Sequence, residues 1–225
     1  NGRPEKNQFL CVAGGYQGET LGTLSGGDVA LYKDAYAPLL RQAATVLSPD
    51  ARAAGPGETA TDVAGRAAAA LEAHLAEHHE SIAAFIVEPL VQGAGGMIMY
   101  DSHYLRLARE LCDRYAVHLI CDEIMVGFGR TGTFFAHEQA GIRPDFLCLS
   151  KGLTSGYLPL SVVMTTDEVY AAFYDDALVR GFLHSHSYTG NPLACRAALA
   201  TLDLFAEDDV LARNRRFAKR FTALL

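Results

Sequence analysis

Five short stretches of this sequence are apolar at nearly every position, and they constrain the fold more than any other feature. They occupy residues 9–12, 83–87, 117–121, 146–149 and 160–164. A strand with one solvated face alternates polar and apolar residues, whereas a strand of a parallel sheet is covered on both faces and is apolar throughout. We therefore expect these stretches to form strands that are mostly parallel.

Longer stretches with helical periodicity separate the strands. The apolar residues that share one helical face are Val63, Ala67, Ala70, Leu71 and Leu75 in one stretch, and Tyr104, Ala108, Leu111 and Tyr115 in another. We expect Asp101 to cap the second helix, residues 48–58 to form a loop, and residues 191–205 and 210–225 to be helical. Alternating strands and helices predict an α/β fold, a three-layer sandwich with a mostly parallel central sheet.

The length of the chain fits one large domain or one and a half small ones, and we expect one large domain over residues 1–225. The net charge is −7 and no basic run occurs, so we expect neither nucleic acid nor a membrane surface as a partner. No apolar run is long enough to cross a bilayer. The chain begins at Asn1 without a methionine and stops at Leu225 inside a helical pattern. We therefore expect it to be part of a longer protein.

Neither the cysteines nor a histidine cluster predicts a metal site. The five cysteines form no CxxC pair and no zinc spacing, and they are Cys11, Cys112, Cys121, Cys148 and Cys195. Core packing and a reducing cytoplasm fit them best. His74 and His78 have the i,i+4 spacing of metal ligands, but the sequence pattern clusters no acidic or cysteine ligands with them, which favours a solvated helix end.

The first chemistry-bearing motif is at residues 120–124 (ICDEI), where an apolar strand ends in Asp122 and Glu123. A glycine-rich turn follows at residues 127–132 (GFGRTG). Ligands of open α/β sheets bind beyond the carboxyl ends of strands, and a buried carboxylate there needs a cationic partner. The protonated pyridine nitrogen of pyridoxal phosphate is such a partner. Alone, the motif is equally compatible with a helix N-cap or a metal ligand.

The second motif is at residues 146–152 (FLCLSKG), where an apolar strand runs directly into Lys151. A lysine amine that is desolvated in a pocket at a strand end can lose its proton and form a Schiff base. The segment 152–156 (GLTSG) after it is expected to be flexible. The alternative is a lysine whose amine reaches solvent.

The third motif is at residues 184–192 (HSHSYTGNP), where small hydroxyl residues and a glycine lead into a helix. Such segments bind phosphate through hydroxyl groups and free backbone amides. A serine–histidine hydrolase is the alternative, but the G-x-S-x-G turn of that class does not accompany the motif.

Together, the three motifs resemble those of the class III aminotransferases, which belong to the fold-type I enzymes that use pyridoxal 5'-phosphate. Further matching stretches are residues 14–20 (GGYQGET), 88–89 (EP) and 93–96 (GAGG). The resemblance covers essentially the whole chain, with the motifs in family order. It implies the large cofactor domain of that fold. It also implies that the family's upstream phosphate loop and C-terminal small domain lie outside these 225 residues.

The resemblance also implies roles for individual residues. Lys151 would carry the cofactor as a Schiff base and later shuttle a proton to and from the substrate carbon. Asp122 would pair with the pyridine nitrogen, with Ile124 against one ring face, Tyr16 against the other, and Glu88 ordering the pocket.

The resemblance also implies which residues contact the substrate and which reach the partner subunit. Ser187, with His186 beside it, would reach a cofactor phosphate across the interface of a homodimer with shared active sites. Arg130, Tyr16 and Ser185 would lie on the substrate side. The expected partners are therefore a small-molecule amino donor, a keto acceptor and a second copy of the chain.

Within the family, residues 88–97, 127–132 and 184–195 are most similar to the branch that acts in biotin synthesis. That branch transfers an amino group from S-adenosylmethionine to 7-keto-8-aminopelargonate. Ornithine- and aminobutyrate-type relatives usually have glutamine where Met125 stands. The family usually has histidine where this chain has Gln17.

Alternative functions remain compatible with the sequence. They are another class III transaminase of ω-amino acids or amines, a racemase or decarboxylase on the same fold, and a catalytically idle relative that forms dimers.

Overall fold

A computed structural model describes residues 2–224, and the chain divides into two compact units. Unit 1 consists of residues 2–122 together with His137–Pro144. Unit 2 consists of Glu123–Ala136 and residues 145–224. The expectation of one large domain over residues 1–225 stays a prediction, and the two units are described separately below.

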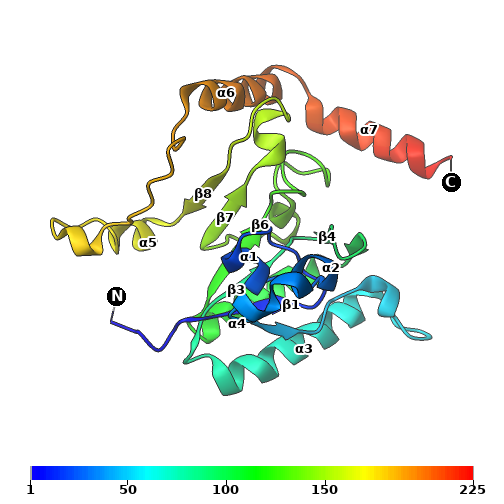
Figure 1. The fold of residues 1–225 in the computed structure, drawn as a ribbon. Helices are drawn as coiled ribbons and strands as arrows, with labels where there is room; N and C mark the ends of the chain where they lie inside the picture. The colour runs from blue at the N-terminus through cyan, green and yellow to red at the C-terminus, as the bar shows by residue number, and fades with distance from the viewer. Residues whose placement is uncertain (1, 225) are drawn as a thin grey trace. The chain divides into compact units, whose positions relative to one another are not determined.

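Unit 1 is built on four parallel strands (Figure 1). They are β1 (Gln8–Val12), β2 (Ala44–Val46), β3 (Ile82–Val87) and β6 (His118–Asp122), in the spatial order β2-β1-β3-β6. Their central residues Leu10, Phe85 and Leu119 are fully buried. Successive residues point to opposite faces of a strand, and Leu10 and Cys11 in β1 and Ala84 and Phe85 in β3 are all buried. These two strands are therefore covered on both faces, as the sequence pattern predicts.

Two long helices pack on this sheet. In α3 (Ala60–His78), Thr59 and Asp62 form a capping box at the N-terminus. Helix α3 packs against β2 and against α4 (His103–Arg114), and α4 packs against β6. The shorter elements of unit 1 are α1 (Leu21–Ser25), α2 (Ala30–Lys33), η1 (Asp34–Leu39), η2 (Ala51–Ala53) and the hairpin of β4 (Val91–Gln92) and β5 (Ile98–Met99). A further 3-10 helix, η3 (Ala136–Ala140), lies where the chain passes between the units.

Unit 2 contains an antiparallel pair, β7 (Phe146–Leu149) and β8 (Val162–Thr165). Two helices follow, α6 (Pro192–Glu207) and α7 (Val210–Thr222). Its short elements are η4 (Lys151–Thr154), α5 (Asp167–Ala171) and η5 (Leu178–Arg180).

The expected α/β class with mostly parallel strands is confirmed, and the five predicted strands agree with observed strands to within two residues. Several expectations need correction. The helical face of α3 buries Ala64 and Ala68, while Ala70 is only half-buried. The N-cap of α4 is Ser102 rather than Asp101, although the Asp101 carboxylate accepts the His103 N–H at 2.7 Å.

Residues 20–46 also differ from expectation, since they hold two short helices, a 3-10 helix and strand β2, none of which was predicted. In the part of the chain that the structure describes, no helix combines the length and the apolarity needed to span a bilayer.

Candidate functional site

In unit 1, Glu88 and Tyr16 lie together at the carboxyl ends of β3 and β1. The Glu88 carboxylate accepts the Tyr16 N–H through Oε1 and the Gly93 N–H through Oε2, each at 2.9 Å. Glu88 is 7% exposed, so both bonds are shielded from water. The buried Tyr100 hydroxyl donates to the Glu88 carbonyl at 2.5 Å. Glu88 thus connects the turn that carries Tyr16 to the β4–β5 hairpin.

Further polar side chains hold the same turn. Gln92 is 1% exposed, and its amide donates to the Ala13 carbonyl at 2.9 Å while accepting from the Ser48 hydroxyl at 2.6 Å. The Asp28 carboxylate accepts the Gly14 N–H at 2.9 Å. A Cβ on Gly95 would lie 2.2 Å from the Gly14 carbonyl oxygen, so only glycine fits there. The backbone that positions Tyr16 is therefore fixed from several sides.

The Tyr16 side chain has its own partners. Its hydroxyl donates to Glu19 Oε1 at 2.9 Å, and its ring lies 5.0 Å from the Tyr32 ring, measured between centroids. Partial burial, together with the hydrogen bond to Glu19, raises the pKa of Tyr16 to about 12. The phenol consequently keeps its proton throughout the neutral range.

Asp122 is the last residue of β6, where the strand's apolar register delivers it to the carboxyl end of the sheet. It is 7% exposed. A carboxylate in that position has exchanged most of its water for protein contacts. A cationic group is the partner that best offsets the lost hydration free energy.

In unit 2, a loop that begins at Glu123 carries Ile124 and Arg130. Glu123 is fully buried, and its Oε2 accepts the Ala136 N–H at 2.9 Å, which closes the loop at its base. The Glu123 N–H donates to the Cys148 carbonyl at 3.0 Å, which anchors the loop to β7. Ile124 is half-buried, and the Arg130 Nε donates to the Met125 carbonyl at 2.8 Å.

Lys151 begins the 3-10 helix η4 directly after β7 and has a left-handed backbone with φ of +43°. The segment 152–156, for which flexibility remains a prediction, includes part of η4 and contacts other residues of unit 2. Leu153 and Thr154 are buried, and the Thr154 hydroxyl donates to the Leu158 carbonyl at 2.5 Å. The Ser155 hydroxyl hydrogen-bonds that of Thr201 on α6 at 3.0 Å. These contacts explain how a non-glycine residue keeps an unfavourable φ.

The Lys151 side chain is exposed, which differs from the desolvated amine expected at this strand end. Whether Lys151 carries a cofactor stays a prediction.

The predicted phosphate segment of unit 2 is exposed throughout residues 182–190, including Ser185, His186 and Ser187. The Tyr188 N–H donates to His186 Nδ1 at 3.2 Å. The N-cap of α6 is Asn191, whose Oδ1 accepts the Leu193 N–H at 3.0 Å. The residue that caps α6 is therefore Asn191 and not Ser187.

The structure thus brings Tyr16 and Glu88 together in unit 1, while Ser185, His186 and Ser187 are neighbours in sequence on one exposed segment of unit 2. No role in the site was predicted for Asp28 or Gln92, and Glu123 was noted only as the second carboxylate at its strand end. For Glu123, the available signal was its place beside Asp122 at the end of an apolar strand.

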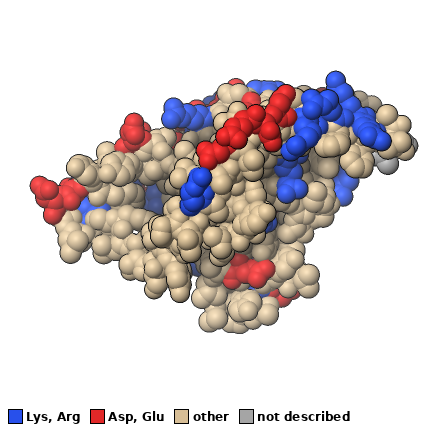
Figure 2. Space-filling view, turned by 90° about the horizontal axis from the view of Figure 1, so that it is seen from above, with Lys and Arg blue, Asp and Glu red and all other residues tan. Residues whose placement is uncertain are grey.

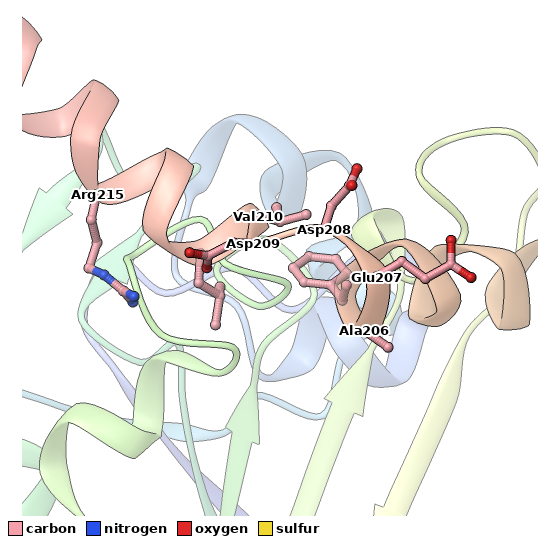
Figure 3. Close-up of a pocket in the computed structure, with 8 residues that line it drawn as sticks. Ala206, Glu207, Asp208, Asp209, Val210 and Arg215 are labelled. Atoms are coloured by element: carbon pink, nitrogen blue, oxygen red, sulfur yellow. The ribbon is translucent and has the colours of Figure 1, made fainter.

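A pocket in unit 2 lies between the end of α6 and the start of α7 (Figure 3), and none of the predicted site residues lines it. The carboxyl groups of Glu207, Asp208 and Asp209 point in different directions there, so they do not converge on a cation. Arg215, which also lines it, donates to the Gly132 carbonyl at 2.9 Å. This pocket has no arrangement of groups suited to catalysis.

The histidine pair in unit 1 gives no metal site. The His74 and His78 rings lie 4.6 Å apart between centroids, and His78 contacts Glu77 at 3.6 Å. Residues 2–224 contain no group of three or more histidine, cysteine or acidic side chains placed to hold a metal ion.

Contrary to the expectation of no basic run, five basic residues lie close together in the sequence of α7. Lysine and arginine side chains gather over α7, whose basic residues are Arg213, Arg215, Arg216, Lys219 and Arg220 (Figure 2). Large apolar side chains are exposed elsewhere in unit 2, among them Val163, Phe182, Leu183 and Tyr188. An exposed apolar surface of this kind is typical of a contact region for another protein surface.

Comparison with known proteins places this geometry in a family context. The sequence model of "Aminotransferase class-III" matches residues 1–225. The adenosylmethionine-8-amino-7-oxononanoate aminotransferase of Helicobacter pylori is 49% identical over 211 residues, which are 93% of this chain and 46% of that protein. The chain therefore spans about half the length of the curated relatives it matches.

Solved structures give the same picture. The adenosylmethionine-8-amino-7-oxononanoate aminotransferase of Methanocaldococcus jannaschii superposes with a TM-score of 0.83 at 34% identity, over 94% of this chain and 47% of that one. A PLP-bound amine transaminase from an uncultivated Pseudomonas species gives 0.85 at 34% identity, over 93% and 48%. These likenesses confirm the predicted α/β fold of the family.

Proposed function

Because the chain belongs to the class-III aminotransferases, we propose that the protein transfers amino groups with pyridoxal 5'-phosphate as its cofactor. One observation carries the proposal. In this chain, the carboxylate of Asp122 is buried at the end of β6. Lys151 follows β7 in an anchored turn, where its backbone is left-handed. Backbone strain of this kind concentrates at functional sites.

The residues present fit the cofactor. Asp122 would hold a proton on the pyridine nitrogen, since its buried carboxylate suits a cationic partner. Lys151, in the turn that follows β7, would bind the cofactor covalently through Nζ. Ile124 would pack on one ring face and Tyr16 on the other, with Glu88 fixing the Tyr16 backbone. When bound, the cofactor supplies an electron sink for charge on the substrate carbon.

Lys151 would then move a proton at that carbon, because the same amine is freed when substrate takes its place. Tyr16 would not compete as a base near neutral pH, because its pKa is raised to about 12. Arg130 and Ser185 are proposed to lie on the substrate side, where both side chains are exposed in this chain.

For the substrates, we propose S-adenosylmethionine as amino donor and 7-keto-8-aminopelargonate as acceptor, which gives 7,8-diaminopelargonate in biotin synthesis. The 49% identical relative named for this activity supports the proposal. The alternative is an amine or ω-amino acid donor, which the likeness to an amine transaminase favours. We further propose that the protein acts in the cytoplasm, consistent with its five free cysteines.

We also propose a homodimer with shared sites, in which Ser187 and His186 reach a phosphate held by the partner subunit. Its support is the exposed segment 182–190, which combines hydroxyl groups with the large apolar side chains Phe182, Leu183 and Tyr188. At a pyridoxal phosphate concentration too low to load Ser187→Ala dimers, a mixture of Lys151→Ala and Ser187→Ala subunits should form one site with neither lesion, and so should recover part of the activity. A fully active monomer would contradict the shared site.

The function is tested by adding donors one at a time to the yellow, cofactor-loaded intact protein. S-Adenosylmethionine should bleach the visible absorbance, and subsequent 7-keto-8-aminopelargonate should restore it, with 7,8-diaminopelargonate identified by mass. Bleaching by simple amines but not by S-adenosylmethionine would support the alternative. A protein that takes up pyridoxal phosphate and responds to no donor would contradict an aminotransferase.

A further inference from the structure

The backbone on each side of one contact in unit 2 is left-handed at a non-glycine residue. Phe128 has φ of +57° and Lys151 has φ of +43°, and the Phe128 side chain lies against Gly152, the residue after Lys151. Few non-glycine residues adopt this conformation, because the Cβ atom crowds the backbone. Two such residues at one contact require surroundings that hold them there.

The contact at Gly152 leaves no spare room. A Cβ built on Gly152 would lie 2.9 Å from Phe128 Cβ, 3.0 Å from Cδ2 and 3.2 Å from Cγ. Only a glycine lets the phenylalanine side chain approach the backbone so closely. The peptide that follows Lys151 is therefore blocked from moving toward Phe128.

Phe128 is itself held in place. Its ring centroid lies 5.5 Å from that of Phe134 and 5.8 Å from that of Phe135, and Phe134 packs edge-to-face on Phe205 of α6 at 5.0 Å. The buried Glu123 carboxylate closes the loop that carries Phe128. An aromatic cluster with a closed loop makes a firm surface against which the Lys151 turn can rest.

We propose that Phe128 is a positioning residue for Lys151: it packs against Gly152 and so holds the lysine turn in its left-handed conformation. The inference rests on the proposed role of Lys151 as the cofactor-binding residue. The competing interpretation is that Phe128 contributes only to core packing, as its neighbours in the cluster do.

The chain offers a matched control for this distinction. Phe128→Leu and Phe134→Leu make the same chemical change in the same aromatic cluster. The three heavy atoms nearest to a Cβ built on Gly152 all belong to Phe128, and none belongs to Phe134. Amide hydrogen exchange in the cofactor-free intact protein reports the turn directly. The Leu153 amide donates to the Ser150 carbonyl, and the Ser155 amide donates to that of Gly152.

Phe128→Leu should speed exchange of these two amides by about ten-fold, and Phe134→Leu by no more than about three-fold at comparable global stability. Phe128→Leu should also slow attachment of added pyridoxal phosphate to Lys151, trapped by borohydride and measured by peptide mass, by about ten-fold. Equal effects of the two variants on the amides and on attachment would overturn the proposal.

A double-mutant cycle adds a second test. Gly152→Ala should slow attachment at least about ten-fold, since the new Cβ meets Phe128. In a Phe128→Gly background, where glycine suits the left-handed backbone, the same change should cost no more than about three-fold. Equal costs in both backgrounds would contradict the contact, and if Phe128→Gly fails to fold, the leucine pair decides.

The experiments distinguish failure of the proposed function from failure of the proposed role of Phe128. If pyridoxal phosphate does not attach to Lys151 in the wild-type protein, the proposed function fails. The hydrogen-exchange comparison of Phe128→Leu with Phe134→Leu would still decide whether Phe128 holds the turn.

Discussion

Two segments of unit 2 that were predicted to serve one site are held in opposite ways. The turn at Lys151 is anchored by contacts to residues far along the chain, through Phe128 at Gly152 and through Thr201 at Ser155. Residues 182–190 are exposed, and the backbone hydrogen bonds within them are local, such as Thr189 N–H to the His186 carbonyl at 3.0 Å. The first segment is shaped by its own unit, whereas we expect the second to be shaped by what it binds.

This contrast predicts which property of the protein a substitution in each segment should alter. Substitutions at the anchored segment should alter chemistry within a preformed geometry, because the surrounding packing maintains it. Substitutions at the exposed segment should alter binding and leave the fold intact, since the side chains there contribute little buried area.

The largest effect is expected from Lys151→Ala. Removing the amine should lower turnover by about 1,000-fold or more, the scale seen when a covalent catalyst is removed. The side chain is exposed, so the melting temperature should change little. Steady-state kinetics measures turnover, and a thermal melt gives the melting temperature. Near-normal transamination by Lys151→Ala would show that the anchored turn takes no part in the reaction.

Asp122→Asn should come next. The amide keeps the shape of the side chain but loses the charge proposed to hold the pyridine nitrogen protonated. We expect kcat to fall by roughly 100-fold, the scale of one preorganised electrostatic group, with a smaller change in KM. A loss confined to the KM of the amino donor would assign Asp122 a binding role instead.

Ser187→Ala tests the exposed segment. A hydrogen bond to phosphate is charge-assisted and contributes about 1.5–3 kcal/mol, so cofactor affinity should weaken by roughly ten-fold or more. Stability should not fall, because Asn191 rather than Ser187 caps α6. Cofactor titration of the apo protein gives the affinity, and Ser185→Ala is the neighbouring control, expected to affect the KM of substrate more than cofactor affinity.

The smallest effect on function is expected from Asn191→Ala, which removes the observed cap of α6. Loss of an N-cap costs about 1 kcal/mol, so the free energy of unfolding should drop by that amount. Cofactor affinity should stay unchanged. If Asn191→Ala weakened cofactor binding as much as Ser187→Ala, the separation between anchoring and binding residues would not hold.

The sequence predicted the parts of the fold that depend on local pattern. Strands β1, β3, β6, β7 and β8 were found because apolar residues fill most of each, and the placement of Asp122 and Lys151 near strand ends followed from them. Helices α1 and α2 were missed because five and four residues are too few to show a helical period.

Contacts between distant residues could not be predicted. No local sequence pattern predicts that Glu88 accepts the Tyr16 N–H or that Phe128 contacts Gly152, because these pairs form only once the chain is folded. The left-handed backbone at Lys151 was equally invisible, because residue type predicts positive φ mainly at glycine and asparagine.

The central claim is that Lys151 is the residue that carries the cofactor, and chemical trapping tests it most directly. The intact protein is incubated with pyridoxal phosphate, reduced with borohydride and digested, and the labelled peptides are identified by mass. The account predicts stoichiometric label on the peptide that contains Lys151, with Lys6, Lys33 and Lys219 unlabelled. Label spread over several lysines, or retained in full by Lys151→Ala, would contradict it.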